Sequence, residues 1–192
     1  MATTTATRLE NFQGWNEGDW KPGIRLTAPS AGADVYFTLL SRSSSAGSTS
    51  TGIYLNDWAD VGVGTNRSLV LGDQSILRVE FLKPLRAGED AQNPNRARQL
   101  VRGLSFYWAF RPDYTELDKL LDAKDHVEDQ LVDTKAVRME LKRDNGSYLQ
   151  ENYVPTTTMT KVVLAGVVFD ELLFTTSRFG TVYFDKFEWT LV

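Results

Sequence analysis

The stretch Leu104-Ser105-Phe106-Tyr107-Trp108-Ala109-Phe110 decides the class of fold. Large apolar side chains occupy every second position of it, and this period places them on one face of a β-strand. Such a set of aromatic rings needs an opposing layer that removes it from water. The sequence therefore predicts strands that pack in two layers around an aromatic core.

The same period of two recurs along the chain. At residues 77–81 and 137–142 the apolar residues alternate with charged ones, which is typical of strands with one face in a core and the other in water. Further short strands are expected at residues 24–27, 35–40, 53–58 and 68–71, and long ones at residues 161–174 and 181–192. We expect about nine or ten strands.

One segment indicates a helix. Asp113 could cap its start, and Glu116 stands three residues later, as in a capping box. The apolar positions that follow at intervals of three or four are Leu117, Leu120, Leu121, Val127 and Leu131. The predicted fold class is all-β: a jelly-roll-like sandwich of two antiparallel sheets with one short helix. Residues 1–8 are expected to form an N-terminal arm, and residues 9–192 a single sandwich domain.

The amino-acid composition excludes several classes of function. The chain has 192 residues, no cysteine and a net charge of -4. Disulfides, thiolate chemistry and cysteine metal sites are therefore excluded, and a polyanion such as nucleic acid is not the expected partner. A signal peptide and a membrane-spanning apolar run are not found, so we expect synthesis in a cytoplasm and no membrane partner.

Catalytic motifs are not found either. The one histidine, His126, falls in the charged segment Lys124-Asp125-His126-Val127-Glu128-Asp129, where a surface helix position is the plain interpretation. No Gly-x-Ser-x-Gly turn accompanies it. A carboxylate pair of the glycosidase type could be recognised only from a structure. We expect a protein that is not an enzyme.

Two long loops are expected. Residues 41–51 are rich in serine and contain no side chain that could anchor them in a core. Residues 86–102 hold Arg86, Arg96, Arg98 and Arg102, and this loop is either solvated or contacts a partner or an anion.

Two acidic residues stand out near the ends of the chain. In a regular C-terminal strand, Asp185 shares a face with Tyr183, Phe187 and Trp189, so its carboxylate would point inward and need a partner. Glu10 has the same phase as a neighbouring phenylalanine in the first strand. Adjacent terminal strands would join Glu10 and Asp185 as the start of a calcium site completed by carbonyl oxygens. The alternative is a pair of hydrogen-bonded or rim-exposed acids, and folding itself requires no cofactor.

The two ends also carry a resemblance. Leu9-Glu10-Asn11-Phe12 with Gly14-Trp15, and Gly180-Thr181-Val182-Tyr183-Phe184-Asp185-Lys186-Phe187, resemble the ends of jelly-roll domains typified by carbohydrate-binding modules. The resemblance covers roughly the first 15 and last 30 residues and the strand count between them. It implies a structural calcium held by Glu10 and Asp185, and it implies glycan recognition.

Sugar binding would need exposed aromatic rings, because a ring face packs against the apolar face of a pyranose. The candidates for ligand stacking are Trp20, Tyr54, Trp58 and Tyr107. Packing in the core or at its rim is the alternative for each.

The function that we favour is structural. A cysteine-free β-sandwich with an arm and long loops is similar to the decoration, or cement, proteins of tailed-phage capsids and to some tail proteins. The sequence thus predicts a non-catalytic virion protein that bridges neighbouring capsid or tail subunits and makes contacts with its own copies. A carbohydrate-binding module is the alternative.

Overall fold

The fold is described by a computed structural model. It covers residues 7–12, 15–23, 25–28, 34–42, 51–55, 67–90, 93, 95–112, 137–153, 158–176 and 180–192. These residues form thirteen β-strands in two antiparallel sheets, and no helix occurs among them. The expected all-β class with two antiparallel sheets is therefore confirmed. In the described ranges, no helix has the length and apolar character needed to cross a membrane.

The larger sheet has seven strands in the order β11-β8-β13-β6-β5-β2, and β1 also pairs with β13. Its strands are β1 (Thr7–Glu10), β2 (Gly18–Asp19), β5 (Gly52–Leu55), β6 (Arg67–Leu71), β8 (Val101–Pro112), β11 (Thr160–Phe169) and β13 (Gly180–Leu191). The six-stranded sheet has the order β10-β9-β12-β7-β4-β3. Its strands are β3 (Arg25–Ala28), β4 (Asp34–Ser41), β7 (Ile76–Leu82), β9 (Val137–Arg143), β10 (Gly146–Tyr153) and β12 (Glu171–Thr176).

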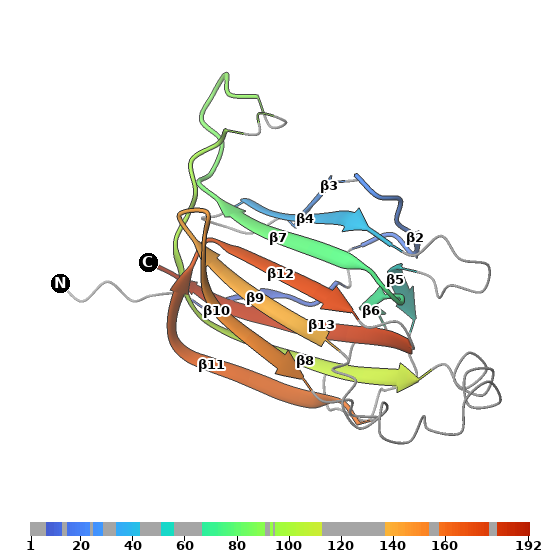
Figure 1. The fold of residues 1–192 in the computed structure, drawn as a ribbon. Helices are drawn as coiled ribbons and strands as arrows, with labels where there is room; N and C mark the ends of the chain where they lie inside the picture. Colours follow the sequence, from blue (N-terminus) through green and yellow to red (C-terminus); the bar gives the residue numbers. More distant parts are fainter. Residues whose placement is uncertain are drawn as a thin grey trace.

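The two sheets form the layers of a sandwich around an aromatic core (Figure 1). Phe106 of β8 meets Phe174 of β12 edge to face, with ring centroids 5.5 Å apart. Trp189 of β13 meets Phe81 of β7 at 5.3 Å. Each pair joins strands of different sheets and contributes about 0.5–1.5 kcal/mol beyond the area it buries. The alternation at residues 104–110 thus identified one wall of this core.

The long apolar run predicted at residues 161–174 is two strands rather than one. It breaks at Asp170, whose backbone N–H donates to the Lys142 carbonyl at 3.0 Å and whose carbonyl accepts from the Phe81 N–H at 3.0 Å. A side-chain oxygen of Asp170 also accepts from the N–H of Asp144 at 3.0 Å. These bonds fix the corner at which the chain leaves the seven-stranded sheet and enters the six-stranded one.

Strand β10 was not predicted. A turn at Asp144 and Asn145, whose φ values are 52° and 64°, separates β9 from β10. A strand with four polar residues and one glycine follows it and pairs with β9. Its weak apolar alternation hid it, because an edge strand needs little burial.

Several expectations fall outside the described residues. They are the helix at residues 113–131, most of the serine-rich loop at residues 41–51, and the first six residues of the N-terminal arm. The last two residues of that arm, Thr7 and Arg8, belong to β1 and pair with β13. The jelly-roll connectivity stays a prediction.

Strand β13 corrects the expected orientation of Asp185. Its pairing with β8 slips between Asp185 and Glu188, and Lys186 has φ of 47°, which marks a β-bulge. The bulge reverses the phase of the strand, so Phe184 and Phe187 both point into the core. Asp185 therefore does not share a face with Phe187, although its side chain is still buried.

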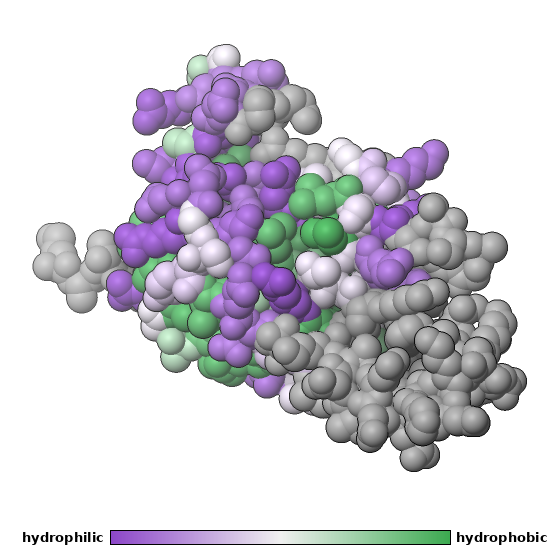
Figure 2. All heavy atoms as spheres, viewed as in Figure 1, coloured by the Kyte–Doolittle hydropathy of each residue, from purple (hydrophilic) through white to green (hydrophobic). Residues whose placement is uncertain are grey.

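The connection from β7 to β8 rises from the end of the sandwich (Figure 1). Its polar residues cover this projection in Figure 2. Arg96 fixes its base: the guanidinium donates to the Tyr36 hydroxyl, to Asp34 and, at 2.6 Å, to the Lys83 carbonyl. The loop expected at residues 86–102 is thus confirmed in outline, except that Arg102 belongs to β8.

Candidate functional site

Three neighbouring strands, β11, β8 and β13, place two rows of side chains on the outer face of the seven-stranded sheet. The ladder sets these residues opposite one another because all three strands are antiparallel. One row is Lys161, Tyr107 and Asp185, and the next is Val163, Ser105 and Glu188. Tyr107 and Asp185, both expected to have a function, are therefore direct cross-strand neighbours.

Glu188 is the centre of a polar network in these rows. The Ser105 hydroxyl donates to its carboxylate at 2.7 Å, and the Lys161 ammonium donates at 3.2 Å. The Ser105 hydrogen bond holds the pKa of Glu188 below its ordinary value, with smaller help from Lys161 and against a contribution from burial. Glu188 is therefore an ionised and oriented carboxylate at neutral pH. The Lys161 ammonium also lies 5.5 Å from the centre of the Tyr107 ring.

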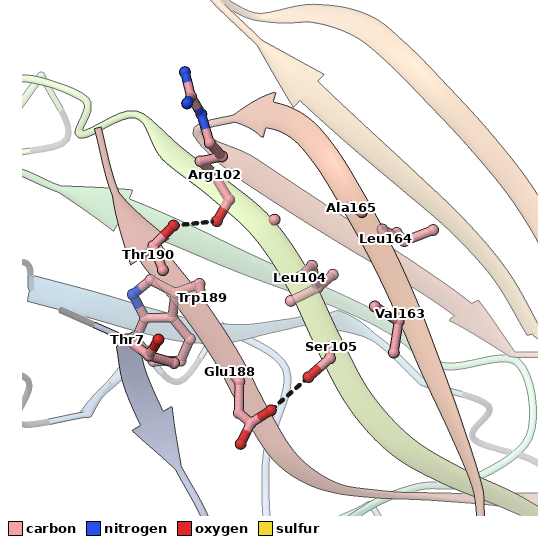
Figure 3. A pocket seen from close by; sticks show the side chains of 11 residues that line it. Thr7, Arg102, Leu104, Ser105, Val163, Leu164, Ala165, Glu188, Trp189 and Thr190 are labelled. Atoms are coloured by element: carbon pink, nitrogen blue, oxygen red, sulfur yellow. Dashed lines mark hydrogen bonds between the residues drawn. The ribbon is translucent and has the colours of Figure 1, made fainter. Parts of the chain in front are cut away.

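An open groove of about 250 Å³ adjoins this network (Figure 3). It follows β8 between β11 and β13, and Gly103 stands at its floor. Both ladders slip there: on β13, Trp189 and Thr190 pair with Leu104 and Arg102 and skip Gly103. Gly103 has φ of 64°, which suits glycine, and it leaves the floor without a side chain. The wall formed by β11 is apolar.

Glu10 and Asp185 meet where β13 changes partner. Strand β6 pairs with β13 up to Phe184, and β1 pairs with the same side of β13 from Phe187 onward. Asp185 lies in the gap between them, and Glu10 is the last residue of β1. The expected approach of the two terminal strands is therefore present.

Glu10 is held by its own chain. Its Oε1 accepts from the Phe12 N–H at 2.6 Å and from the Trp15 indole at 3.0 Å. Burial raises the pKa of Glu10, hydrogen bonds from Phe12, Trp15 and Asn11 lower it in part, and the charge of Asp185 raises it further. Asp185 accepts from the Lys186 N–H at 2.7 Å. Both carboxylates thus accept hydrogen bonds, as the alternative to a calcium site expected.

A calcium ion would need more ligands than this pair supplies, since it takes six to eight oxygens. Within the described ranges, no three acidic, histidine or cysteine side chains gather as a metal site. Backbone carbonyl oxygens would have to complete the set around Glu10 and Asp185. Calcium binding by this pair stays a prediction.

The four aromatic candidates do not form one surface. Trp20 is 4% exposed and packs against Trp15, with ring centroids 5.7 Å apart, so it belongs to the core, as its alternative interpretation had it. Tyr54 is half-buried, and its hydroxyl donates to Asp19. Tyr107 is half-buried beneath Lys161. Trp58 lies outside the described residues.

The groove and its charged neighbours were missed at the sequence level. One signal was available, because a glycine next to a strongly alternating strand often marks a bulge. Ser105, Lys161 and Glu188 carried no signal, since their convergence depends on the register of three strands that are distant in sequence.

Comparison of the chain with protein families, with curated proteins and with solved structures finds no match in any of the three.

Proposed function

We propose that this protein is a non-catalytic structural subunit that holds neighbouring proteins of a larger assembly through its seven-stranded sheet. The observation that carries the proposal is β11, which lies at one edge of that sheet, with the two-residue strand β2 at the other. It is ten residues long, it is nearly all apolar, and Val163 at its middle is 63% exposed. A long apolar edge of this kind favours association with another chain.

The other sheet offers a contrast. Its edge strand β10 has the sequence GSYLQENY, with four uncharged polar or acidic residues besides its tyrosines. Strand β11 has the sequence TKVVLAGVVF and one charged residue, Lys161. Figure 2 shows apolar side chains over the part of the surface where Figure 1 places β11, and a second apolar group near β4 and β7. The difference in composition between the edge strands β10 and β11 supports docking through β11 rather than non-specific association.

The carboxylates near the candidate site are occupied in ways that favour binding over turnover. Glu188 is bonded to Ser105 and Lys161, and Glu10 to Phe12 and Trp15. An acid or base catalyst must be able to reach a substrate proton. Side chains so engaged are held in fixed positions, which supports a protein that is not an enzyme.

The assembly that we propose is a virion, with the protein as a decoration or cement protein synthesised in the host cytoplasm. Capsid or tail subunits, and further copies of the chain itself, would be its partners. Each contact would bury surface only in the assembled particle, so binding would stabilise the particle by mass action.

Co-sedimentation tests this function. Protein from its native source should travel with particles of megadalton size, and it should leave them when salt or denaturant opens the contacts. Protein found only as a free monomer in that source would refute the proposal.

Glycan recognition on a jelly-roll domain is the second candidate, and the half-buried ring of Tyr107 beside polar groups favours it. Retention on an immobilised polysaccharide, lost in Tyr107→Ala and kept in Tyr54→Ala, would support it. Failure to bind across a broad glycan panel would reject it.

A further inference from the structure

The groove above Gly103 is small and open to solvent, and we call the space directly above Gly103 the socket. Its volume of about 250 Å³ is smaller than the roughly 300–1,000 Å³ of pockets for drug-sized ligands. Val163, Leu164 and Ala165 of β11 form one wall, and Thr190 of β13 lies on the opposite side (Figure 3). A Cβ atom added to Gly103 would have only the Leu164 carbonyl oxygen within 4 Å, at 3.6 Å. The space above the floor is therefore open to an incoming group.

Most polar groups around this socket are already bonded to one another. The Ser105 hydroxyl donates to Glu188 at 2.7 Å, and the Thr190 hydroxyl donates to the Arg102 carbonyl at 2.7 Å. Lys161 is taken by Glu188 at 3.2 Å. A sugar ring would find few free hydrogen-bonding groups for its hydroxyls, whereas an apolar side chain would need none.

One charge at the groove is unmatched. The Arg102 side chain is exposed and extends away from the sheet in Figure 3. Among the described residues, no acidic side chain forms an ion pair with it. A carboxylate brought by a partner would complement this guanidinium, with a bidentate geometry available to it.

We propose that this groove binds an extended segment of a neighbouring protein subunit, with one apolar side chain above Gly103 and an adjacent acidic side chain paired with Arg102. The inference rests on the proposed docking function and names the chemistry of the partner. The exposed Val163 continues the contact from the socket toward the outer edge of β11, which pairs with β8 alone among the described strands. The neighbouring subunit would thus be recognised by apolar shape and one negative charge.

The test uses heptapeptides selected from a displayed random library on the full chain. Their affinities are then measured by fluorescence anisotropy against four proteins: wild type, Gly103→Asn, Arg102→Gln and the control Arg138→Gln. Asparagine tolerates positive φ and would fill the socket, while Arg102→Gln changes only an exposed side chain. Arg138 is half-exposed on the other sheet, so it matches the loss of one positive charge.

We expect the selected peptides to share an apolar residue next to Asp or Glu. Their binding should weaken at least tenfold in Gly103→Asn and in Arg102→Gln, and less than twofold in Arg138→Gln. Peptides that bind all four proteins equally, a library that yields no binder, or a sugar that competes at Gly103 would overturn the inference. Co-sedimentation of Gly103→Asn with native particles separates the two claims. If the wild type and this variant sediment alike, docking stands and the groove assignment falls.

Discussion

Arg98 lies where two buried carboxylates face each other. Glu80 and Glu171 are direct cross-strand partners on β7 and β12, a like-charge arrangement that is unfavourable alone. The Arg98 guanidinium lies 3.1 Å from each of them, and Lys142 adds a contact to Glu171 at 3.5 Å. Arg78 contacts Glu80 at 3.5 Å as well. Arg98 is therefore the side chain that bridges the two acids, and it ties the projecting connection to the sheet.

Replacing this arginine should be costly. We expect Arg98→Leu to lower the free energy of unfolding by about 2–4 kcal/mol, because the two buried carboxylates lose the cation that bridges them and keep only the longer contacts of Arg78 and Lys142. Urea denaturation at pH 7 measures the loss. The control is Arg143→Leu, whose partner Asp144 is exposed, and it should change stability by less than about 0.5 kcal/mol. Equal losses in the two variants would contradict the account.

Glu10 gives a stability that depends on pH. Its pKa in the folded protein is raised above 4.5, so the folded protein keeps this proton at pH values where the unfolded chain has released it. The contribution of Glu10 to stability therefore declines as the pH rises through the window above 4.5. Glu10→Gln keeps an oxygen acceptor without the charge, and it should be at least as stable as wild type at pH 7, with a smaller difference at pH 4.

The alanine variant separates charge from hydrogen bonding. Glu10→Ala removes the acceptor of the Phe12 N–H and the Trp15 indole, and we expect it to cost about 1–3 kcal/mol at pH 7. Urea denaturation in EDTA between pH 4 and 8 compares the three proteins. Equal instability of the glutamine and alanine variants at pH 7 would show that the charge of Glu10 is needed.

Bound calcium would make the Glu10 carboxylate stabilising. If Glu10 and Asp185 ligate calcium, millimolar calcium should raise the Tm of wild type relative to EDTA and leave the Tm of Glu10→Gln unchanged. Differential scanning calorimetry decides the matter. An identical Tm of the wild type in calcium and in EDTA would contradict calcium binding by Glu10 and Asp185.

At the scale of the element, the bulge in β13 positions the site. It turns Phe187 and Trp189 inward after Phe184, and it leaves Asp185 in the gap between β6 and β1. Lys186 adopts φ of 47° to do this, a conformation that is unfavourable for most residues with a side chain. Some stability is thus given up at the bulge.

Substitutions at Lys186 should follow backbone preference. Lys186→Gly should equal or exceed the wild type in stability, while Lys186→Val should lose about 1–2 kcal/mol, since a β-branched residue is poorly tolerated at positive φ. Thermal unfolding ranks the three proteins. A valine variant as stable as glycine would mean that the strand is regular at this point.

The elements also show what the sequence can and cannot reveal. Strand β8 was evident because its apolar residues keep a strict period of two, and its rings do fill the core. Strand β10 was missed because its composition is polar. The division of residues 161–174 into two strands at Asp170 was missed because the residues on both sides of Asp170 are mostly apolar. The orientation of Asp185 was wrong because a single bulge reverses every later position. An apolar period of two shows which face of a strand is buried. It does not show which residues of neighbouring strands pair with one another.

At the scale of the whole molecule, the two sheets differ in what they present. The outer face of the six-stranded sheet carries ion pairs of its own, including those of Arg98 and Lys142, beside the exposed Leu40 of β4. The seven-stranded sheet has an apolar edge strand, β11, beside a groove with Arg102, which forms no ion pair with an acidic side chain in the described ranges. Because of this difference, we expect a neighbouring protein to bind the seven-stranded sheet at β11 and not the six-stranded sheet.

Amide hydrogen exchange of the protein, free and attached to its native particle, tests this expectation. We predict that attachment slows exchange in β11 and leaves β10, an edge strand of the other sheet, unchanged, because only β11 would gain backbone partners. Protection of β10 with unaltered exchange in β11 would contradict the claim that the seven-stranded sheet is the docking side.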